Sequence, residues 1–485
     1  MEIIKKINDF YFRSAGEHYS TEYQQLRNLL DDNDIWVKNL SLKPYFITPD
    51  KRDEFSKVTE ILLNVFEKLT AACFNNNEIR NILSINGRIK DYLGINPGYS
   101  GKIQVARLDG FYNMQEDSLK FLEINPDNPS YHGINDLFIN SFDQLPSLKY
   151  LRKEYNVQSE LLIDPLYKML IKKYKEYCLY YKKREQEDPH IAVVCSRNSF
   201  IRNDVNIIVK YLKEKNQNVS YADPRDFTYD GEVLRLNGKK ADIVYRDTLK
   251  DFFRTESSGK IHSRIRNKIL NYTRYACLHN RYINYSLKKG YFGHAEDIIK
   301  AYSDNNICII NPFSSGLCAQ KLSFAVIQDE RFKAFFNEEE LDTIERYIPW
   351  TRILGKYKTL YYNKQIDIVN FVKLNRQKFV LKPNKGYGGK GIIIGSEIEQ
   401  KDWESKINTI IETGLSYTVQ EYINIPSETF PLYSNGNYQG LSPLYFNLNF
   451  WGIDGKFAGG YVRASDKKII NVTQGGILVP LYYVN

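Results

Sequence analysis

The chain of 485 residues is 42% hydrophobic and 26% charged, which is typical of a globular protein with two or three domains. Its 67 basic and 58 acidic residues give a formal net charge of +9, which suits an anionic partner but does not choose among a nucleotide, an acidic protein and a nucleic acid. The sequence has no apolar run long enough to span a membrane, no signal-peptide pattern at its start and no paired spacing among its six cysteines, so we expect a cytoplasmic protein with reduced cysteines and no membrane contact.

The pattern of apolar residues divides the chain into five predicted parts. Helical spacing runs through the first part, period-two alternation on both sides of the turn-like NMQEDS predicts a β-hairpin in the second, and a Lys/Glu/Tyr-rich stretch predicts a helical third part. Strand and helix patterns then alternate as in a small parallel α/β domain, and a helix-rich piece followed by strands makes up the last part. The predicted parts are 1–95, 96–147, 148–187, 188–310 and 311–485.

The predicted hairpin carries four polar residues that meet on one face. Arg107 and Asp109 are two positions apart on its first strand, and Glu123 and Asn125 are two positions apart on its second, so each pair points to one side. Antiparallel pairing then gathers two carboxylates, an amide oxygen and a guanidinium. Hard oxygen ligands of this kind suit Mg²⁺ that still carries substrate phosphate, whereas two carboxylates without a cation repel each other. The alternative is a solvated hairpin face with cross-strand ion pairs.

The segment FVLKPNKGYGGKGIIIG, residues 379–395, predicts a strand, a glycine-rich loop and a second strand. Glycine lets backbone amides approach a phosphate closely, and Lys382 and Lys390 add positive charge. The spacing is not that of a Walker A loop, and the strand that follows excludes a Rossmann turn. The segment therefore predicts a flap over a triphosphate, with a plain glycine-rich hairpin as the alternative. The loop glycines are Gly386, Gly388, Gly389 and Gly391.

The segment TVQEYINIP, residues 418–426, predicts an apolar strand that ends in a short polar stretch. Backbone groups at this end could face the edge of an adenine, and an ordinary strand end is the alternative. The residues concerned are Gln420, Glu421, Tyr422 and Ile423.

A further predicted hairpin lies within residues 447–476, where Asp454-Gly455 makes a tight turn between two alternating strands. Arg463 lies near the end of the second strand, and Asn471 begins the next segment. A guanidinium and an amide on neighbouring strands suit phosphate oxygens. A structural salt bridge is the alternative for Arg463.

Taken together, these pieces resemble the nucleotide site of the ATP-grasp superfamily in a rotated order, because the R-x-D … E-x-N hairpin comes first instead of last. The sequence resembles the circularly permuted branch, which is related in layout to glutathionylspermidine synthases. NPFSSGLCAQKLSFAVI (311–327) and YIPWTRIL (347–354) resemble two segments that precede the flap in that branch. The resemblance covers roughly residues 100–485 and implies an α/β protein, with a circularly permuted ATP-grasp fold and a small parallel α/β pre-ATP-grasp domain at 188–310.

The resemblance also implies an enzyme that uses ATP and Mg²⁺ to activate a carboxylate as an acyl phosphate and to join it to an amine or a thiol, with ADP and phosphate released. Arg107 would stabilise the reacting acyl phosphate, and Arg463 would contact phosphate oxygens. Asp109, Glu123 and Asn125 would ligate one or two Mg²⁺ ions. The nucleotide would be held by Lys321, Lys382, Gly386, Gly388, Gly389, Gly391, Gln420, Glu421, Tyr422, Ile423 and Asn471.

Other functions stay open at the level of sequence. The same site suits a phosphotransferase that phosphorylates a small molecule without ligation, or a binding module that has lost catalysis. Residues 262–292 are basic and aromatic, which fits an acidic carrier protein that delivers an acyl group, or a nucleic acid. We expect instead an amphipathic helical pair with its aromatic side chains in the core. Small-molecule carboxylate and amine or thiol substrates are the expected partners.

Overall fold

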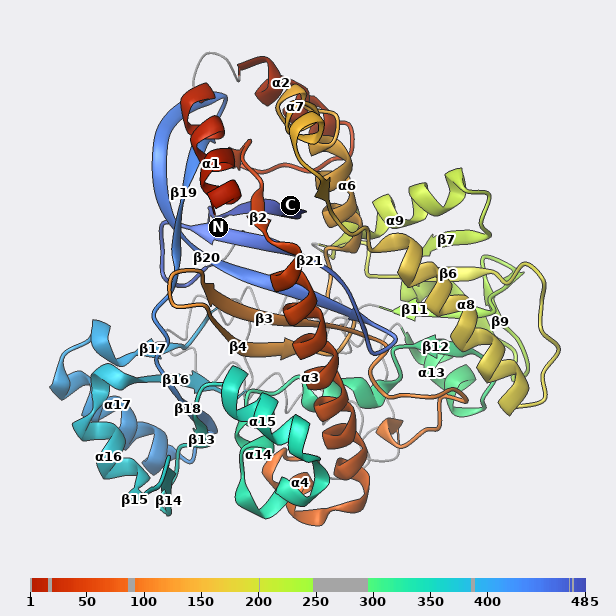
Figure 1. Ribbon diagram of the computed structural model, residues 1–485. Coiled ribbons are helices and arrows are strands. Elements are labelled where there is room, and N and C mark those ends of the chain that lie inside the picture. Colours follow the sequence, from red (N-terminus) through yellow and green to blue (C-terminus); the bar gives the residue numbers. More distant parts are fainter. Residues whose placement is uncertain are drawn as a thin grey trace, which may run out of the picture.

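The computed structural model describes residues 2–15, 20–85, 92–199, 201–246, 295–384, 389–470, 472 and 475–485. A large sheet occupies the middle of the molecule, a smaller α/β unit lies on one side, and a separate lobe lies on the other (Figure 1). The mixture of helices and strands expected from the sequence is confirmed. Four predictions fall outside the described residues: those on the segment 262–292, Gly386, Gly388 and Asn471.

The central sheet has nine strands that come from both ends of the chain (Figure 1). Its order is β1-β19-β20-β21-β22-β2, with β3 pairing both β20 and β4, and β5 pairing β22. The strands are β1 (Asn39–Ser41), β2 (Tyr45–Ile47), β3 (Val105–Asn113), β4 (Ser118–Asn125), β5 (Val157–Gln158), β19 (Ser427–Ser434), β20 (Asn437–Ile453), β21 (Lys456–Ser465) and β22 (Ile477–Val484). The early hairpin therefore lies beside strands that are made more than three hundred residues later, as the 354-residue separation of Asp109 and Arg463 shows.

The N-terminal part is helical, as predicted, apart from the two short strands β1 and β2. Its helices are α1 (Glu2–Ser14), α2 (Ser20–Asp31), α3 (Pro49–Asn75) and α4 (Asn77–Ile82). Helix α3 starts with Pro49, whose fixed φ suits a first helical turn, and it crosses one face of the central sheet. Gly452 of β20 allows the close approach, because a Cβ there would lie 2.2 Å from Leu63. Phe55 also packs on Phe450, with ring centroids 5.3 Å apart.

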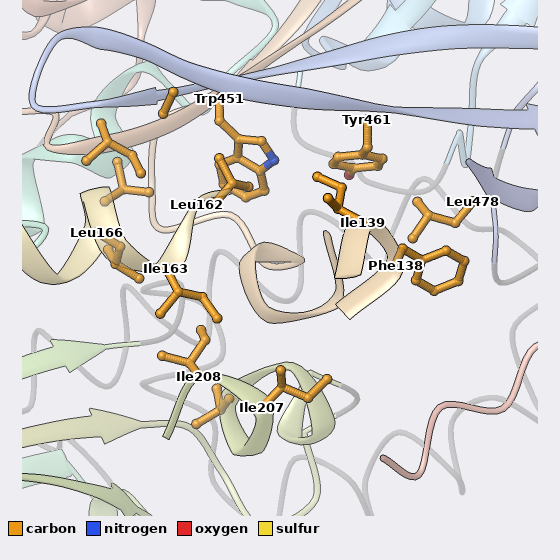
Figure 2. Packing of buried hydrophobic residues seen from close by; sticks show 14 of the residues in the cluster. Phe138, Ile139, Leu162, Ile163, Leu166, Ile207, Ile208, Trp451, Tyr461 and Leu478 are labelled. Atoms are coloured by element: carbon orange, nitrogen blue, oxygen red, sulfur yellow. The ribbon is translucent and has the colours of Figure 1, made fainter. Parts of the chain in front are cut away.

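The predicted helical connector contains α7 (Pro146–Glu154) and α8 (Ile163–Tyr180), and α6 (His132–Phe142) precedes them. Helix α6 is sandwiched between the central sheet and α9 (Arg202–Glu214) of the smaller unit (Figure 2). The sheet contributes buried side chains such as Trp451 and Tyr461, and α9 contributes Ile207 and Ile208. Burial of this apolar layer fixes the smaller unit against the sheet.

Buried carboxylates cap two of these helices from neighbouring elements. Asp204 of α9 accepts the backbone amides of Tyr131 and Ile134 at the start of α6. Asp136 of α6 accepts the amides of Leu162 and Ile163 at the start of α8, at 2.7 and 2.9 Å. Burial raises the pKa of Asp136 to about 7, although these amide hydrogen bonds act in the opposite direction. Helix packing in this layer therefore depends on acids whose protonation changes near neutral pH.

The smaller unit is the parallel α/β arrangement expected from the sequence. Its sheet has the order β12-β11-β6-β7, and all three pairings are parallel. Its elements are β6 (Ile191–Val194), α9, β7 (Val219–Ala222), η2 (Pro224–Asp226), β11 (Ile243–Arg246), α13 (Glu296–Ser303) and β12 (Cys308–Ile310), with an antiparallel sheet of β8 (Phe227–Tyr229), β9 (Leu234–Leu236) and β10 (Lys239–Lys240) attached.

The lobe has its own four-stranded sheet, of order β13-β18-β16-β17, and its own hydrophobic core around Phe379, Leu381 and Trp403. Its elements are β13 (Thr351–Ile353), β14 (Lys358–Tyr361), β15 (Lys364–Asp367), α16 (Ile368–Leu374), η6 (Arg376–Lys378), β16 (Phe379–Pro383), β17 (Ile393–Ile394), η7 (Gly395–Glu397), α17 (Gln400–Thr413) and β18 (Tyr417–Glu421). The elements that lead into it are η4 (Phe313–Cys318), α14 (Leu322–Ile327), η5 (Glu330–Phe335) and α15 (Glu338–Tyr347). The two strands predicted on either side of the glycine loop are thus confirmed as β16 and β17.

No helix among the described residues is long and apolar enough to cross a membrane. The five cysteines in the described ranges, Cys73, Cys178, Cys195, Cys308 and Cys318, are free and buried, as expected from their spacing.

Candidate active site

The hairpin of β3 and β4 pairs as the sequence pattern predicts. Asp109 lies directly opposite Glu123, and Arg107 lies opposite Asn125. A β-bulge follows at Asp109/Gly110, where the register shifts by one residue. The four polar residues therefore share one face at the end of the hairpin that lies next to β20.

The long hairpin of β20 and β21 completes this surface. Strand β3 pairs with β20 so that Asp109 faces Asn449, and Asn447 of β20 faces Arg463 of β21. Asp454 and Gly455 form the predicted turn, both with positive φ, which is the geometry of a tight two-residue hairpin. Arg463 Nη2 reaches across to Asp109 Oδ2 at 2.9 Å. The early hairpin and the late hairpin thus meet in one charged cluster.

Asp109 lies at the centre of this cluster, and its side chain contacts three donors. Oδ1 accepts the Nε of Arg107 at 2.7 Å. Oδ2 accepts the Nη2 of Arg107 at 3.1 Å, the Nη2 of Arg463 at 2.9 Å and the Nδ2 of Asn125 at 3.3 Å. Burial alone would raise the pKa of Asp109, but the two guanidinium groups outweigh it and hold that pKa below its ordinary value. Asp109 is therefore ionised and doubly paired.

Arg107 is buried in an aromatic slot. Its guanidinium lies 5.6 Å from the ring centroid of Trp451 and 5.7 Å from that of Tyr461. Its Nη1 also donates to the carbonyl of Ser130 at 3.4 Å. Arg463 differs, because its buried Nε has no hydrogen-bond partner in the described part of the chain. The Nε of Arg463 is therefore the donor of this pair of arginines that could contact a ligand.

Two lysines lie near the same surface. Lys382 is on a strand of the lobe, and Lys321 is on the segment that leads into the lobe. Lys321 immediately precedes α14, and its Nζ lies 3.6 Å from Glu123 Oε1. Lys382 of β16 donates to Gln420 Oε1 at 2.5 Å and lies 3.5 Å from the carbonyl of Leu122. Burial, and then the charge of Lys321, lower the pKa of Lys382 to about 8, while Glu123 partly offsets this. Two like charges are therefore held close together, and the carboxylate of Glu123 acts on both.

The described end of the glycine loop packs against the strip that follows β21. Gly389 has a φ of +73°, and a Cβ there would lie 2.1 Å from Ile469 Cγ2. Gly391 also has a positive φ, at +78°. These two loop glycines are thus required by backbone conformation and, at Gly389, by close approach. Nearby, Lys468 pairs with Glu397 at 2.8 Å and joins the lobe to the central sheet.

The end of β18, predicted to face adenine, is largely engaged within the protein. The amide of Glu421 donates to the carbonyl of Trp350, and the amide of Tyr422 donates to the carbonyl of Lys378, both at 2.8 Å. The carboxylate of Glu421 accepts the hydroxyls of two tyrosines of the β14–β15 hairpin, at 2.9 and 2.8 Å. These two amides and this carboxylate already have partners within the protein, so fewer groups at this strand end are left for the predicted contact with adenine.

Sequence reasoning missed the residues that hold the lysines in place. Asn384, next to the flap, is buried, and its backbone and side-chain oxygens accept the amides of Lys321 and Leu322 at 3.2 and 3.1 Å. Its Nδ2 donates to Gln320 Oε1 at 2.9 Å. On the other side, Thr351 Oγ1 accepts Gln420 Nε2 at 2.9 Å and so orients the amide that Lys382 contacts. The available signal in the sequence was the position of Asn384, an amide side chain directly after Lys382-Pro383.

The donor set suits a polyanion that carries a divalent cation. Lys321, Lys382 and the unpartnered Nε of Arg463 supply positive charge, and the partly exposed Glu123 supplies an oxygen ligand. In the described ranges, no group of three or more His, Cys, Asp or Glu side chains is placed so that it could hold a metal ion. A cation here would thus depend on carboxylate, amide and ligand oxygens together.

Comparisons with known proteins agree with this layout at the level of the fold. No family model and no curated protein sequence matches the chain. Among solved structures, a glutathione synthetase-like effector (GSS30) from Globodera pallida, in its apo form, matches with a TM-score of 0.60 and 12% identity over 96% of both chains. The chain therefore shares the overall fold of that glutathione synthetase-like effector.

Two other solved structures overlap more loosely. A candidate γ-glutamylcysteine synthetase from Methylobacillus flagellatus covers 90% of this chain and 89% of its own, with 10% identity and a TM-score of 0.38. A RimK domain ATP-grasp protein from Sphaerobacter thermophilus covers 61% of this chain and 90% of its own, with 9% identity and a TM-score of 0.25. TM-scores this low do not indicate a shared fold. Circular permutation stays a prediction. The match to the effector runs along nearly the whole of both chains, so it does not compare this chain with an ATP-grasp protein of the usual order.

Proposed function

We propose that the chain is an ATP- and Mg²⁺-dependent ligase that activates a carboxylate as an acyl phosphate and joins it to an amine or a thiol, with ADP and phosphate as the other products. The proposal includes a circularly permuted ATP-grasp layout and a cytoplasmic location. The observation that supports it best is the meeting of the early hairpin with Lys321, Lys382 and Arg463 on one surface. That juxtaposition is what the sequence resemblance requires.

The chain's own residues act on charge in this proposal. Lys321 and Lys382 bind anionic oxygens of the nucleotide, and their mutual repulsion is relieved when that anion enters. Arg463 presents its unused Nε to the transferred group, and Arg107 holds its place through its aromatic slot. Bound Mg²⁺, held by hairpin oxygens, would neutralise charge on the transferred phosphoryl group. No side-chain nucleophile is required.

Substrate identity is open to direct test. Small-molecule carboxylates and amines or thiols are the proposed partners, and delivery of an acyl group by an acidic carrier protein is the alternative that residues 262–292 suggest. A small-molecule kinase would use the same charged surface.

The test is ADP release from purified protein with ATP and Mg²⁺, against a panel of amino acids, polyamines and small γ-glutamyl and thiol peptides, with mass spectrometry of the products. An amide or thioester product supports the ligase. A stable phosphorylated product without ligation would establish the kinase, and no ATP turnover or ATP binding under any condition would falsify both. Arg463→Gln is the matched loss-of-function control.

A further inference from the structure

The segment that leads into α6 forms one wall of the slot that holds Arg107. The carbonyl of Ser130 accepts the Nη1 of Arg107 at 3.4 Å. The ring of Tyr131 stacks on Tyr461, with centroids 5.9 Å apart and an interplanar angle of 22°. Tyr461 is in turn one of the two rings beside the guanidinium. The next residue in the chain packs on the other ring, Trp451, at a centroid distance of 3.9 Å. The place of Arg107 therefore depends on how this short segment is held.

Tyr131 adopts a strained backbone conformation within this segment. Its φ is +93°, a value that residues with a side chain rarely adopt. Tyr131 is also the N-cap residue of α6, and its own side chain makes no capping hydrogen bond. A strained turn of this kind persists only when the surrounding structure holds it.

The smaller unit supplies that hold through Asp204 of α9. This carboxylate is buried, and it accepts the amide of Tyr131 at 2.7 Å and the amide of Ile134 at 2.9 Å. Helix α6 is thus capped by a side chain of another unit. Gly133 lets the two helices approach, because a Cβ there would lie 2.6 Å from the carbonyl oxygen of Asp204.

We propose that Asp204 is a positioning residue for Arg107, because it holds residues 130–132 against the guanidinium by binding the first amides of α6. The smaller unit thereby acts on the candidate site through the start of one helix. The inference rests on the proposed function, in which Arg107 keeps its place in the site through its aromatic slot.

Asp136 provides a matched control for Asp204. It is also a buried carboxylate of the layer around α6, and it accepts the amides of Leu162 and Ile163 at the start of α8, at 2.7 and 2.9 Å. Asp204→Asn and Asp136→Asn are both close to isosteric. A general loss of stability should follow from both changes, whereas displacement of Arg107 should follow from D204N.

The first experiment measures how fast phenylglyoxal, which forms adducts with accessible guanidinium groups, modifies Arg107, with peptide mass spectrometry as the readout and the exposed Arg13 as the internal reference. It is done at pH 8, where both carboxylates are mostly ionised, since burial raises the pKa of Asp204 to about 6 and that of Asp136 to about 7 while the helix amides oppose this. We expect D204N to raise the rate at Arg107 by about 10-fold or more, and D136N by less than about threefold.

Three results of this experiment would overturn the inference: an unchanged rate in D204N, equal acceleration in the two variants, or a wild-type Arg107 that reacts as fast as Arg13. If D204N does not fold, Tyr131→Gly replaces it. Glycine adopts the positive φ without strain but lacks the ring that stacks on Tyr461, so we expect faster modification of Arg107. An unchanged rate in Y131G would equally overturn the inference.

The second experiment measures ADP release with ATP, Mg²⁺ and the substrate panel. We expect D204N to lower kcat by about 10-fold or more with the KM for ATP changed by less than about threefold, and D136N to change both by less than about threefold. Equal losses of kcat in the two variants would overturn this inference alone. If wild-type protein neither binds nor turns over ATP, the proposed function fails, and the phenylglyoxal rates still decide whether Asp204 positions Arg107.

Discussion

The two sides of the candidate site balance their charge in different ways. On the sheet side, Asp109 is surrounded by Arg107 and Arg463, so the charges are paired within the protein. On the lobe side, Lys382 has Lys321 as a charged neighbour, and Glu123 offsets part of the effect of that charge on Lys382. The sheet side thus holds its charges in close ion pairs, whereas on the lobe side two positive charges lie near each other and favour an anionic ligand. Affinity for an anion should therefore depend more on the lysines, and structural integrity more on Asp109.

The largest expected effect comes from removing the charge of Lys382. Lys382→Met should weaken binding of a non-hydrolysable ATP analogue about 10- to 100-fold, because a hydrogen bond to a charged group contributes about 1.5–3 kcal/mol. The same change should leave the Tm unchanged or raise it, because the buried ammonium is costly in the free protein. Calorimetry and thermal unfolding measure the two effects. Lys364→Met, at an exposed position of the same lobe, is the control. If Lys382→Met keeps wild-type affinity, the contrast between the two sides does not hold.

The next effect is the pH dependence of binding. The pKa of Lys382 in the free protein is about 8, and a bound anion would raise it. Its contribution to affinity is therefore complete below pH 8 and is lost as the pH rises above 8, by up to about 10-fold per pH unit. Titration of analogue affinity from pH 7 to 9.5 measures this.

Lys321→Met supplies the matched comparison for that titration. Because the charge of Lys321 helps to lower the pKa of Lys382, its removal should move the midpoint of the pH profile upward. Affinity that is independent of pH in wild-type protein would count against Lys382 as an anion contact.

A smaller effect concerns the alignment of the lysines. Asn384→Ala removes hydrogen bonds to the amide of Leu322 and to Gln320, so we expect a loss of about 1–3 kcal/mol in the free energy of unfolding and a roughly fivefold loss of analogue affinity. Asn408→Ala, which affects a surface contact with Lys373, should change neither. Denaturant unfolding and calorimetry on both variants decide whether Asn384 acts on the site or on the fold alone.

The last prediction concerns the pH dependence of folding stability, which is distinct from the pH dependence of analogue binding. Asp136 has a folded pKa of about 7 against an ordinary value of 3.8, so its contribution to stability is present at low pH and is lost as the pH rises to about 7. Wild-type stability should thus fall from pH 5 to 7, by at most about 1.4 kcal/mol per pH unit from this group. Asp136→Asn should flatten that slope in thermal unfolding. An unchanged slope would assign the titration to other groups.

The sequence predicted the parts of the site that depend on local pattern. Period-two alternation located the hairpin whose first strand carries Asp109 and whose second carries Glu123, and the Lys-Pro-glycine segment located strand β16. It did not predict the bulge after Asp109, because a single inserted residue leaves no periodic signal. It also missed β1, β5 and β12, which are too short to show alternation.

Long-range contacts were the other part that the sequence could not supply. The aromatic slot of Arg107 consists of Trp451 and Tyr461, and nothing local to Arg107 indicates them. The same holds for Asn384, whose role follows from its contact with the start of α14 and not from its neighbours in sequence. The family resemblance named Asp109 and Arg463 as parts of one site, and their direct contact is visible only in the structure.

The pairing of β3 with β20 has a consequence for how the protein is made. Asp109 leaves the ribosome 354 residues before Arg463, one of the two arginines that pair with it. Until β20 and β21 emerge, β3 is an open strand edge with a charged end, and such edges associate with other chains. Nascent chains of this protein should therefore depend on chaperone protection late into synthesis, and fragments that end before β20 should aggregate.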